Sequence, residues 1–169
     1  NVIADIRAAR AAGADLVIGI DRDPTALEAA ARTLEPFGSR VRLVHADYRD
    51  YDAVLDRQGL GQVQGTLADL GVSSMQFDAP GRGFSFRHDA PLDMRMDPWA
   101  GESAAQLLAR SDADALATML DEHADEPHAH LIAEVLKRQP ITTTHALERI
   151  VRTGLATAYP GMAKAAVKM

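Results

Sequence analysis

The chain has 169 residues, of which 47% are hydrophobic and 25% charged, and its net charge at pH 7 is −6. This is a one-domain length that can bury a core, and the absence of cysteine excludes disulfides and thiolate metal sites. No apolar run approaches the ~20 residues of a membrane span. The lack of cysteine fits a reducing cytosol, so we expect a cytoplasmic protein. The chain starts at Asn1 rather than Met and ends in mid-pattern, which indicates a fragment.

Three short apolar runs predict strands. They cover residues 15–20, 40–46 and 65–72, and their branched aliphatic side chains are typical of buried parallel strands. Helical sequence precedes and separates them, over residues 2–13, 24–34 and 49–61. This alternation predicts an α/β domain with a parallel sheet.

Helix ends are marked by particular residues. Gly13 closes the first helix, and Gly59 or Gly61 closes the third. Asp23 stands directly before Pro24, so Asp23 is expected to cap the second helix, with Pro24 in its first position.

The regular alternation stops at residue 72. Residues 73–98 form a loop longer than compact domains usually carry without a function. Helical sequence follows over about 102–109, 112–123, 127–138 and 145–151. We therefore predict a partial α/β domain over residues 1–98 and an all-helical inserted subdomain over residues 99–169.

Acidic and aromatic residues follow the predicted strands, where open α/β sheets bind ligands. Asp21 follows the first strand, and a carboxylate there can accept hydrogen bonds from both hydroxyls of a ribose. Asp47 and Tyr48 follow the second strand, where an adenine can stack on the ring or be bonded through its amino group. Asp69 ends the third strand as a buried carboxylate, which favours a function. The alternatives are a helix cap for Asp21 and a plain loop with an aromatic plug for Asp47 and Tyr48.

These strand ends indicate a nucleoside cofactor without deciding which one. The sequence contains no GxGxxG, so a dinucleotide and S-adenosylmethionine both stay open. The histidines and acids of residues 121–130 fit no standard ligand spacing, so we expect no metal site. Ser73 and Ser74 lack the GxSxG context of a serine nucleophile.

Residues 68–98 carry a specific resemblance. They read ADLGVSSMQFDAPGRGFSFRHDAPLDMRMDP and resemble the signature of the bacterial 16S ribosomal RNA cytosine-N4 methyltransferases of the MraW type: DLGVSSxQ, RGFSF and GPLDMRMD. The stretches IGIDRDP (18–24) and RQPITTTHALERIV (138–151) are similar to further blocks of that family. The resemblance covers about residues 16–151.

The resemblance implies a Rossmann-like methyltransferase domain with an inserted helical domain, S-adenosylmethionine as cofactor, and methyl transfer to the N4 amino group of a cytosine in the decoding region of 16S ribosomal RNA. The small ribosomal subunit is the implied partner, and a homodimer stays open. The implied cofactor contacts are Asp21, Tyr48, Asp69 and Gln76. Asp69 is also the candidate catalytic residue.

The loop mixes arginines and aromatic side chains. The resemblance implies that it lines the cytosine pocket, so the candidate RNA-binding residues are Arg82, Phe84, Phe86, Arg87 and Arg95. For each arginine the equal alternative is an ion pair with an aspartate of the same loop, which would only hold the loop's shape.

The sequence departs from the family pattern in three places. Residues 1–14 do not contain the family's glycine-rich first motif, so the fragment alone is expected to lose contacts to the cofactor's methionine end, and its activity by itself stays open. Met75 replaces the usual Pro, and Ala90 the usual Gly. The block expected after residue 152 and the last sheet strands are missing.

Two other functions stay open from the sequence. One is a nucleotide-dependent oxidoreductase on the same strand pattern. The other is a catalytically dead RNA-binding or scaffold relative. From Lys137 onward the chain has six basic residues and one acid, a charge of +5, whereas the residues before it carry −11. A basic end on an acidic body suits a phosphate-bearing partner.

Overall fold

The computed structural model describes residues 2–158, and the chain divides into two compact units. The first unit comprises the residues up to 75 together with residues 96–99, and the second comprises residues 76–95 and those from 100 onward. Lys164 and Lys168, part of the predicted basic end, lie outside the described residues. Among residues 2–158, no helix combines the length and apolar character that crossing a bilayer requires.

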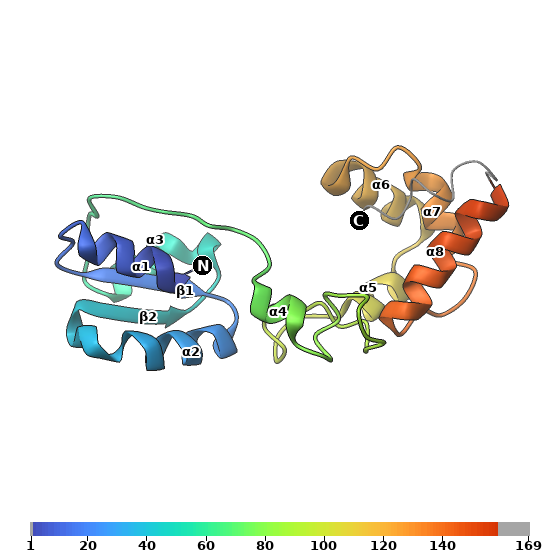
Figure 1. Cartoon of the computed structure of the whole chain (residues 1–169). Helices are drawn as coiled ribbons and strands as arrows, with labels where there is room; N and C mark the ends of the chain where they lie inside the picture. The colour runs from blue at the N-terminus through green and yellow to red at the C-terminus, as the bar shows by residue number, and fades with distance from the viewer. Residues whose placement is uncertain (1, 159–169) are drawn as a thin grey trace. The chain divides into compact units, whose positions relative to one another are not determined.

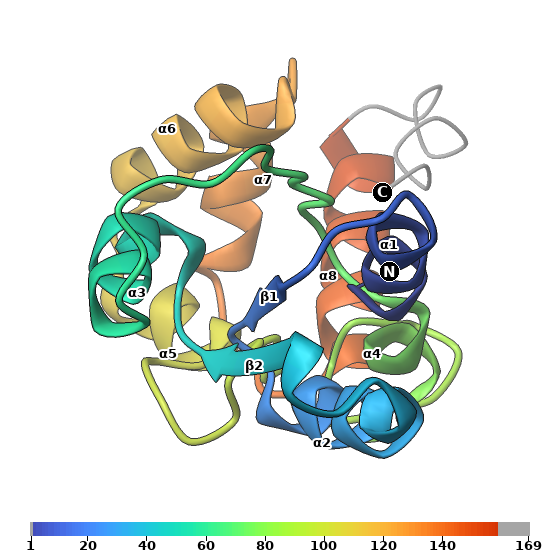
Figure 2. The same cartoon turned by 90° about the vertical axis from the view of Figure 1, so that its left-hand side faces the viewer.

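The first unit is built on a two-stranded parallel sheet. Strands β1 (Val17–Asp21) and β2 (Val41–His45) pair with Asp21 opposite His45. Helices α1 (Val2–Ala11) and α2 (Pro24–Leu34) lie on one side of the strands, and α3 (Tyr51–Arg57) lies on the other (Figure 2). The predicted parallel α/β arrangement is therefore confirmed for these two strands. The small core contains Ile6, Ala30 and Leu34 with side chains of both strands.

Local chemistry explains where these helices begin and end. The Asp23 carboxylate accepts a hydrogen bond from the Thr25 amide at 3.0 Å, so Asp23 caps α2 as predicted. Gly13 follows α1 with φ 93°, a left-handed conformation that favours glycine. Short 3₁₀ helices complete the unit: η1 (Glu35–Arg40) leads into β2, and η2 (Tyr48–Asp50) leads into α3.

The third predicted strand, over residues 65–72, is wrong. The described part of the chain has no strand there, and 72% of Leu67 and 62% of Leu70 are exposed. An apolar run becomes a strand only when a neighbouring strand pairs with its backbone groups, and β1 and β2 pair with each other alone. Within the segment, the Thr66 hydroxyl forms an exposed hydrogen bond of 2.9 Å with the Tyr51 hydroxyl.

The second unit is built from helices. Helix α4 (Ser74–Asp78), which the sequence did not predict, spans the boundary between the units. The predicted helices are confirmed as α5 (Ala104–Arg110), α6 (Ala113–Ala124), α7 (Ala129–Leu136) and a longer α8 (Thr144–Ala158). Helices α6, α7 and α8 pack in succession (Figure 1). The main core comprises Leu92, Ile132, Val135, Leu136, Ile141, Ile150, Val151 and Leu155.

Most of the long loop folds onto these helices. The amides of Ala104 and Ala105 donate hydrogen bonds to the carbonyls of Asp93 and Leu92, at 2.7 and 2.9 Å. Leu92 itself is part of the helical core. Residues 76–95 therefore belong with the helical unit. The proposed division of the chain at residue 98 into an α/β part and a helical part stays a prediction.

Candidate functional site

Asp21 and Asp23 have separate tasks in the first unit. Asp23 is buried, and its Oδ1 accepts hydrogen bonds from the Thr25 amide and, at 2.6 Å, from the Thr25 hydroxyl. Asp21 is half-buried at the end of β1, where its Oδ1 accepts from the Asp23 amide at 2.8 Å. A carboxylate offers about four acceptor positions, so this one bond is compatible with binding a ribose hydroxyl. The cap role therefore belongs to Asp23.

Tyr48 and Asp47 differ in what they can offer a ligand. The Arg49 guanidinium binds both oxygens of the Asp47 carboxylate, at 3.0 and 2.7 Å, and Arg22 lies 3.2 Å from Oδ2. The hydrogen bonds from Arg49 hold the pKa of Asp47 well below its usual range. Tyr48, in contrast, is 58% exposed at the start of η2. Of the two residues, Tyr48 is the one that can stack on a nucleobase.

Asp69 does not have the environment that the sequence predicted. It lies in the irregular segment before α4 and is exposed, so the expectation of a buried carboxylate at a strand end is wrong. The cause is the missing strand pairing of residues 65–72. Gln76 is buried on α4 in the second unit. Of the predicted cofactor contacts, Asp21 and Tyr48 lie at the same edge of the sheet, because Tyr48 follows shortly after His45, the strand partner of Asp21.

A contact at the same edge was missed by sequence reasoning. The Oδ2 atom of the buried Asp97 lies 3.1 Å from Nε2 of His45, and its Oδ1 accepts a hydrogen bond from the Trp99 amide at 2.9 Å. The pair fixes residues 96–99 to the end of β2, while 74% of Trp99 stays exposed. The two residues are far apart in the sequence, and no local pattern indicates that they meet.

Two of the candidate RNA-binding arginines are held inside the loop. Arg95 binds Asp93 with Nε to Oδ1 at 2.9 Å and Nη2 to Oδ2 at 2.7 Å. This pairing lowers the pKa of Asp93. Arg82 donates a hydrogen bond to the Arg95 carbonyl at 2.9 Å, and its guanidinium lies 5.9 Å from the centre of the Phe84 ring. The contacts of Arg82, Phe84 and Arg95, together with Asp93, hold the shape of the loop.

The other two candidates face solvent. Arg87 pairs with Asp78 at 2.9 Å, and both side chains are largely exposed. Such pairs contribute little to stability. Phe86 is also exposed. Phe86 and Arg87 are therefore the members of the candidate RNA-binding set that a large partner can reach without breaking the loop.

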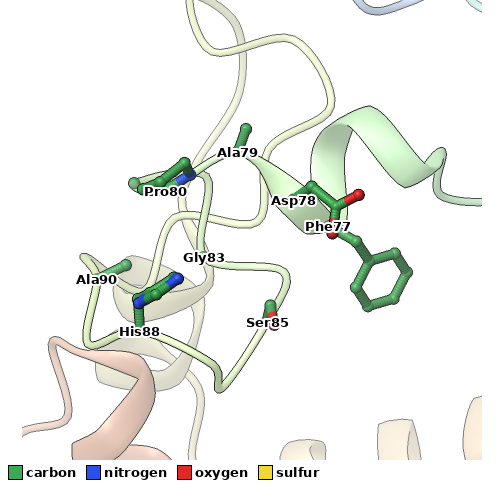
Figure 3. A pocket seen from close by; sticks show the side chains of 9 residues that line it. Phe77, Asp78, Ala79, Pro80, Gly83, Ser85, His88 and Ala90 are labelled. Atoms are coloured by element: carbon green, nitrogen blue, oxygen red, sulfur yellow. The ribbon is translucent and has the colours of Figure 1, made fainter.

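A small pocket lies within the loop. Its lining includes Pro80, Gly83, Ser85, His88 and Ala90, while the ring of Phe77 points away from these residues (Figure 3). Its volume of ≈ 10 Å³ is about what one water molecule needs, so the pocket holds no nucleobase. Residues 2–158 contain no group of three or more His, Asp or Glu side chains placed to hold a metal ion.

Comparison with known proteins gives a consistent result. The model of the MraW methylase family matches residues 10–166. A protein of Parafrankia sp. (strain EAN1pec) named ribosomal RNA small subunit methyltransferase H is 49% identical over 146 residues, which are 84% of this chain and 45% of that protein. Proteins of the same name from Cutibacterium acnes and Methylobacterium sp. (strain 4-46) are 48% and 46% identical, over 80% and 92% of this chain. The chain spans less than half the length of these relatives, covering 41% and 47% of the latter two.

Proposed function

The chain belongs to the MraW methylase family, and from that membership we propose that it is part of an S-adenosylmethionine-dependent methyltransferase that modifies the N4 amino group of a cytosine in 16S ribosomal RNA. The names of its relatives, ribosomal RNA small subunit methyltransferase H, support this substrate class. We expect such an enzyme to act on the small ribosomal subunit in the cytoplasm.

The structural observation that carries the proposal is the position of Asp21. Its carboxylate stands at the carboxyl end of a parallel strand, and Asp23 has taken over the capping of α2. We propose that Asp21 accepts hydrogen bonds from the ribose hydroxyls of the cofactor and that the exposed ring of Tyr48 stacks on the adenine. Gln76 is the further proposed contact, through its amide.

The bound cofactor supplies the methyl group. The amino nitrogen of cytosine is a weak nucleophile because its lone pair is delocalised into the ring, so the protein must hold it in line with the methyl group at near-attack distance. We propose that Asp69 accepts a hydrogen bond from the amino group and so raises the electron density on the nitrogen. The backbone carbonyls of residues 71–73 are the alternative acceptors. The nitrogen can lose its proton after methylation, so no strong base is needed beforehand.

The target base must leave its stack to reach an active site of this kind. We propose that the exposed Phe86 stacks on RNA bases and that the exposed Arg87 binds phosphate. Arg82, Phe84 and Arg95 support this surface from within the loop through their mutual contacts, and any RNA contact of their own is secondary.

The proposal is tested by incubating the chain with tritiated S-adenosylmethionine and 16S ribosomal RNA transcribed in vitro, followed by digestion and mass spectrometry of the nucleosides. The expected product is N4-methylcytidine, formed at a lower rate by Asp69→Asn even when the cofactor is saturating. Label on another nucleoside would contradict the proposed substrate, and a wild-type rate in Asp69→Asn would contradict the role of Asp69.

A further inference from the structure

The segment Thr142–His145 at the start of α8 contacts the loop that carries the candidate RNA-binding residues. It belongs to the block RQPITTTHALERIV, to which the proposed function assigns no role. Both the segment and the loop residues 76–95 lie in the second unit.

Backbone hydrogen bonds join the segment to the loop. The Leu92 amide donates to the Thr142 carbonyl at 2.9 Å, and the Thr144 amide donates to the Ala90 carbonyl at 2.9 Å. Between these bonds, Pro91 and Thr143 form an isolated antiparallel bridge. Residues 90–92 therefore run beside the segment as a short strand would, without belonging to a sheet.

The Thr144 side chain adds a second connection from a buried position. Thr144 is completely buried. Its hydroxyl donates to the His88 carbonyl at 3.0 Å and accepts from the Ala90 amide at 3.1 Å. One hydroxyl thus satisfies a backbone acceptor and a backbone donor in the part of the loop that directly follows Phe86 and Arg87. Leaving such buried groups without partners is costly.

His145 and Asp89 extend the connection toward the aromatic residues. The His145 amide donates to Oδ1 of Asp89 at 3.2 Å, and Nε2 of His145 lies 3.1 Å from the Phe86 carbonyl. A hydrogen bond from the Thr143 side chain, with the His145 amide second, lowers the pKa of Asp89. The four successive residues 142–145, at the start of α8, therefore contact the loop at Phe86, His88, Asp89, Ala90 and Leu92.

We propose that Thr144 is a positioning residue: through His88 and Ala90 it fixes the loop so that Phe86 and Arg87 face the RNA. This inference takes the identity of the ligand, RNA, from the proposed function. The contacts of Thr144 are independent of that function. The positioning role gives the segment Thr142–His145 a task distinct from cofactor binding, because the Thr144 hydroxyl bonds to His88 and Ala90 and to none of the proposed cofactor contacts.

The first test is hydrogen exchange of the whole chain in a Thr144→Val variant, which keeps the shape and removes the hydroxyl. The informative amides are those of Leu92 and Met94, since their acceptors, the carbonyls of Thr142 and Arg82, are unchanged by the substitution. We expect their exchange to accelerate about ten- to a hundredfold, because leaving a buried polar group unpaired makes local opening of the loop easier. The amide of Ile132 in α7 should keep its rate, because only the loop is released.

Two further variants serve as controls. Thr144→Ser retains the hydroxyl and should restore slow exchange at Leu92 and Met94. Thr118→Val makes the same substitution at an exposed position of α6, where it removes a hydroxyl bond of 3.0 Å to the Asp114 carbonyl, and should leave the loop unaffected.

The second test measures ligand affinities of the same variants. With a fluorescein-labelled, cytosine-containing single-stranded oligoribonucleotide as probe, Thr144→Val should bind at least about fivefold more weakly, whereas its affinity for S-adenosylmethionine should stay within about twofold of wild type. Thr144→Ser should restore RNA affinity. A general loss of stability would instead weaken both ligands together and accelerate exchange throughout the unit.

Two results would overturn the positioning role: unchanged exchange at Leu92 and Met94 in Thr144→Val, or an RNA affinity equal to that of wild type despite faster exchange. A wild-type chain that binds no RNA would overturn it as well. Binding of S-adenosylmethionine, compared between wild type and Asp21→Ala, then decides separately whether the proposed function also fails.

Discussion

Asp93 and Arg95 form a two-pronged ion pair across a single residue, Met94, whose backbone is left-handed with φ 59°. This conformation costs a non-glycine residue roughly 1–2 kcal/mol. The pair offsets that cost together with the hydrogen bond of 3.0 Å from the Met94 amide to the Arg82 carbonyl. The charges of the motif LDMRMD therefore hold a turn that its backbone alone would not favour.

The Asp93–Arg95 pair predicts a pH-dependent contribution to stability. Asp93→Asn should lower the free energy of unfolding at pH 7 by about 1 kcal/mol, because a two-pronged, half-buried pair is lost. The folded-state pKa of Asp93 is lowered, so this contribution is complete above the unfolded-state pKa near ~4 and is lost as the pH falls through the folded-state pKa. Urea unfolding of both proteins between pH 7 and pH 2 checks this. A difference that stays constant over that range would contradict it.

Gly83 is predicted to be the least replaceable glycine of the loop. It has φ 76°, and a Cβ there would lie 2.7 Å from the Pro91 carbonyl oxygen and 2.8 Å from the Asp93 amide nitrogen. Gly81 has a similar φ of 94° but open space around it. Gly81→Ala should therefore cost about 1 kcal/mol of stability from backbone strain, and Gly83→Ala roughly 3 kcal/mol or more from strain and overlap together. Equal midpoints of chemical denaturation for the two variants would show that this close approach is absent.

Substitution of Asp23 is predicted to lower stability, and substitution of Asp21 to lower cofactor binding. Asp23→Ala removes the cap of α2 and should destabilise the first unit by about 1 kcal/mol. Asp21→Ala removes only the bond from the Asp23 amide, so its thermal midpoint should stay closer to wild type. Thermal unfolding followed by circular dichroism compares them, and the reverse order of stability would refute the assignment of the cap.

Arg87 is predicted to affect RNA binding without affecting the fold. Its ion pair with Asp78 is exposed, so Arg87→Ala should leave the thermal midpoint unchanged. If Arg87 neutralises one phosphate, the plot of log affinity against log salt concentration for a single-stranded RNA should become shallower by ~0.7. Arg95→Ala is the comparison, and it should lower stability because Arg95 is held by Asp93. An unchanged salt dependence in Arg87→Ala would remove Arg87 from the proposed RNA surface.

Sequence predicted those features that depend on neighbours in the chain. Asp23 beside Pro24 marks the start of α2, and the glycine after α1 marks its end, because capping and left-handed turns involve a few adjacent residues. The run at residues 65–72 has the composition of a strand, but strand formation depends on a partner that composition cannot specify. The prediction failed there, and the expected environment of Asp69 failed with it.

The contacts around the candidate site needed the structure for the same reason. The His45–Asp97 pair and the bonds from Thr144 to His88 and Ala90 join residues that are distant in the sequence. The family resemblance includes Asp97, His88, Ala90 and Thr144, but it did not indicate what these residues touch. For the loop arginines, sequence left phosphate and aspartate as equal partners. The structure pairs Arg95 with Asp93 and Arg87 with Asp78, and only the latter pair is largely exposed.

The most direct test of the central claim is isothermal titration of this chain with S-adenosylmethionine, with Asp21→Ala as the matched variant and circular dichroism to establish that both are folded. We predict saturable binding by wild type and at least a tenfold loss of affinity in Asp21→Ala, because the carboxylate at the end of β1 accepts the ribose hydroxyls. Equal affinity in the two proteins, or no binding by a folded wild-type chain, would contradict the proposed cofactor site.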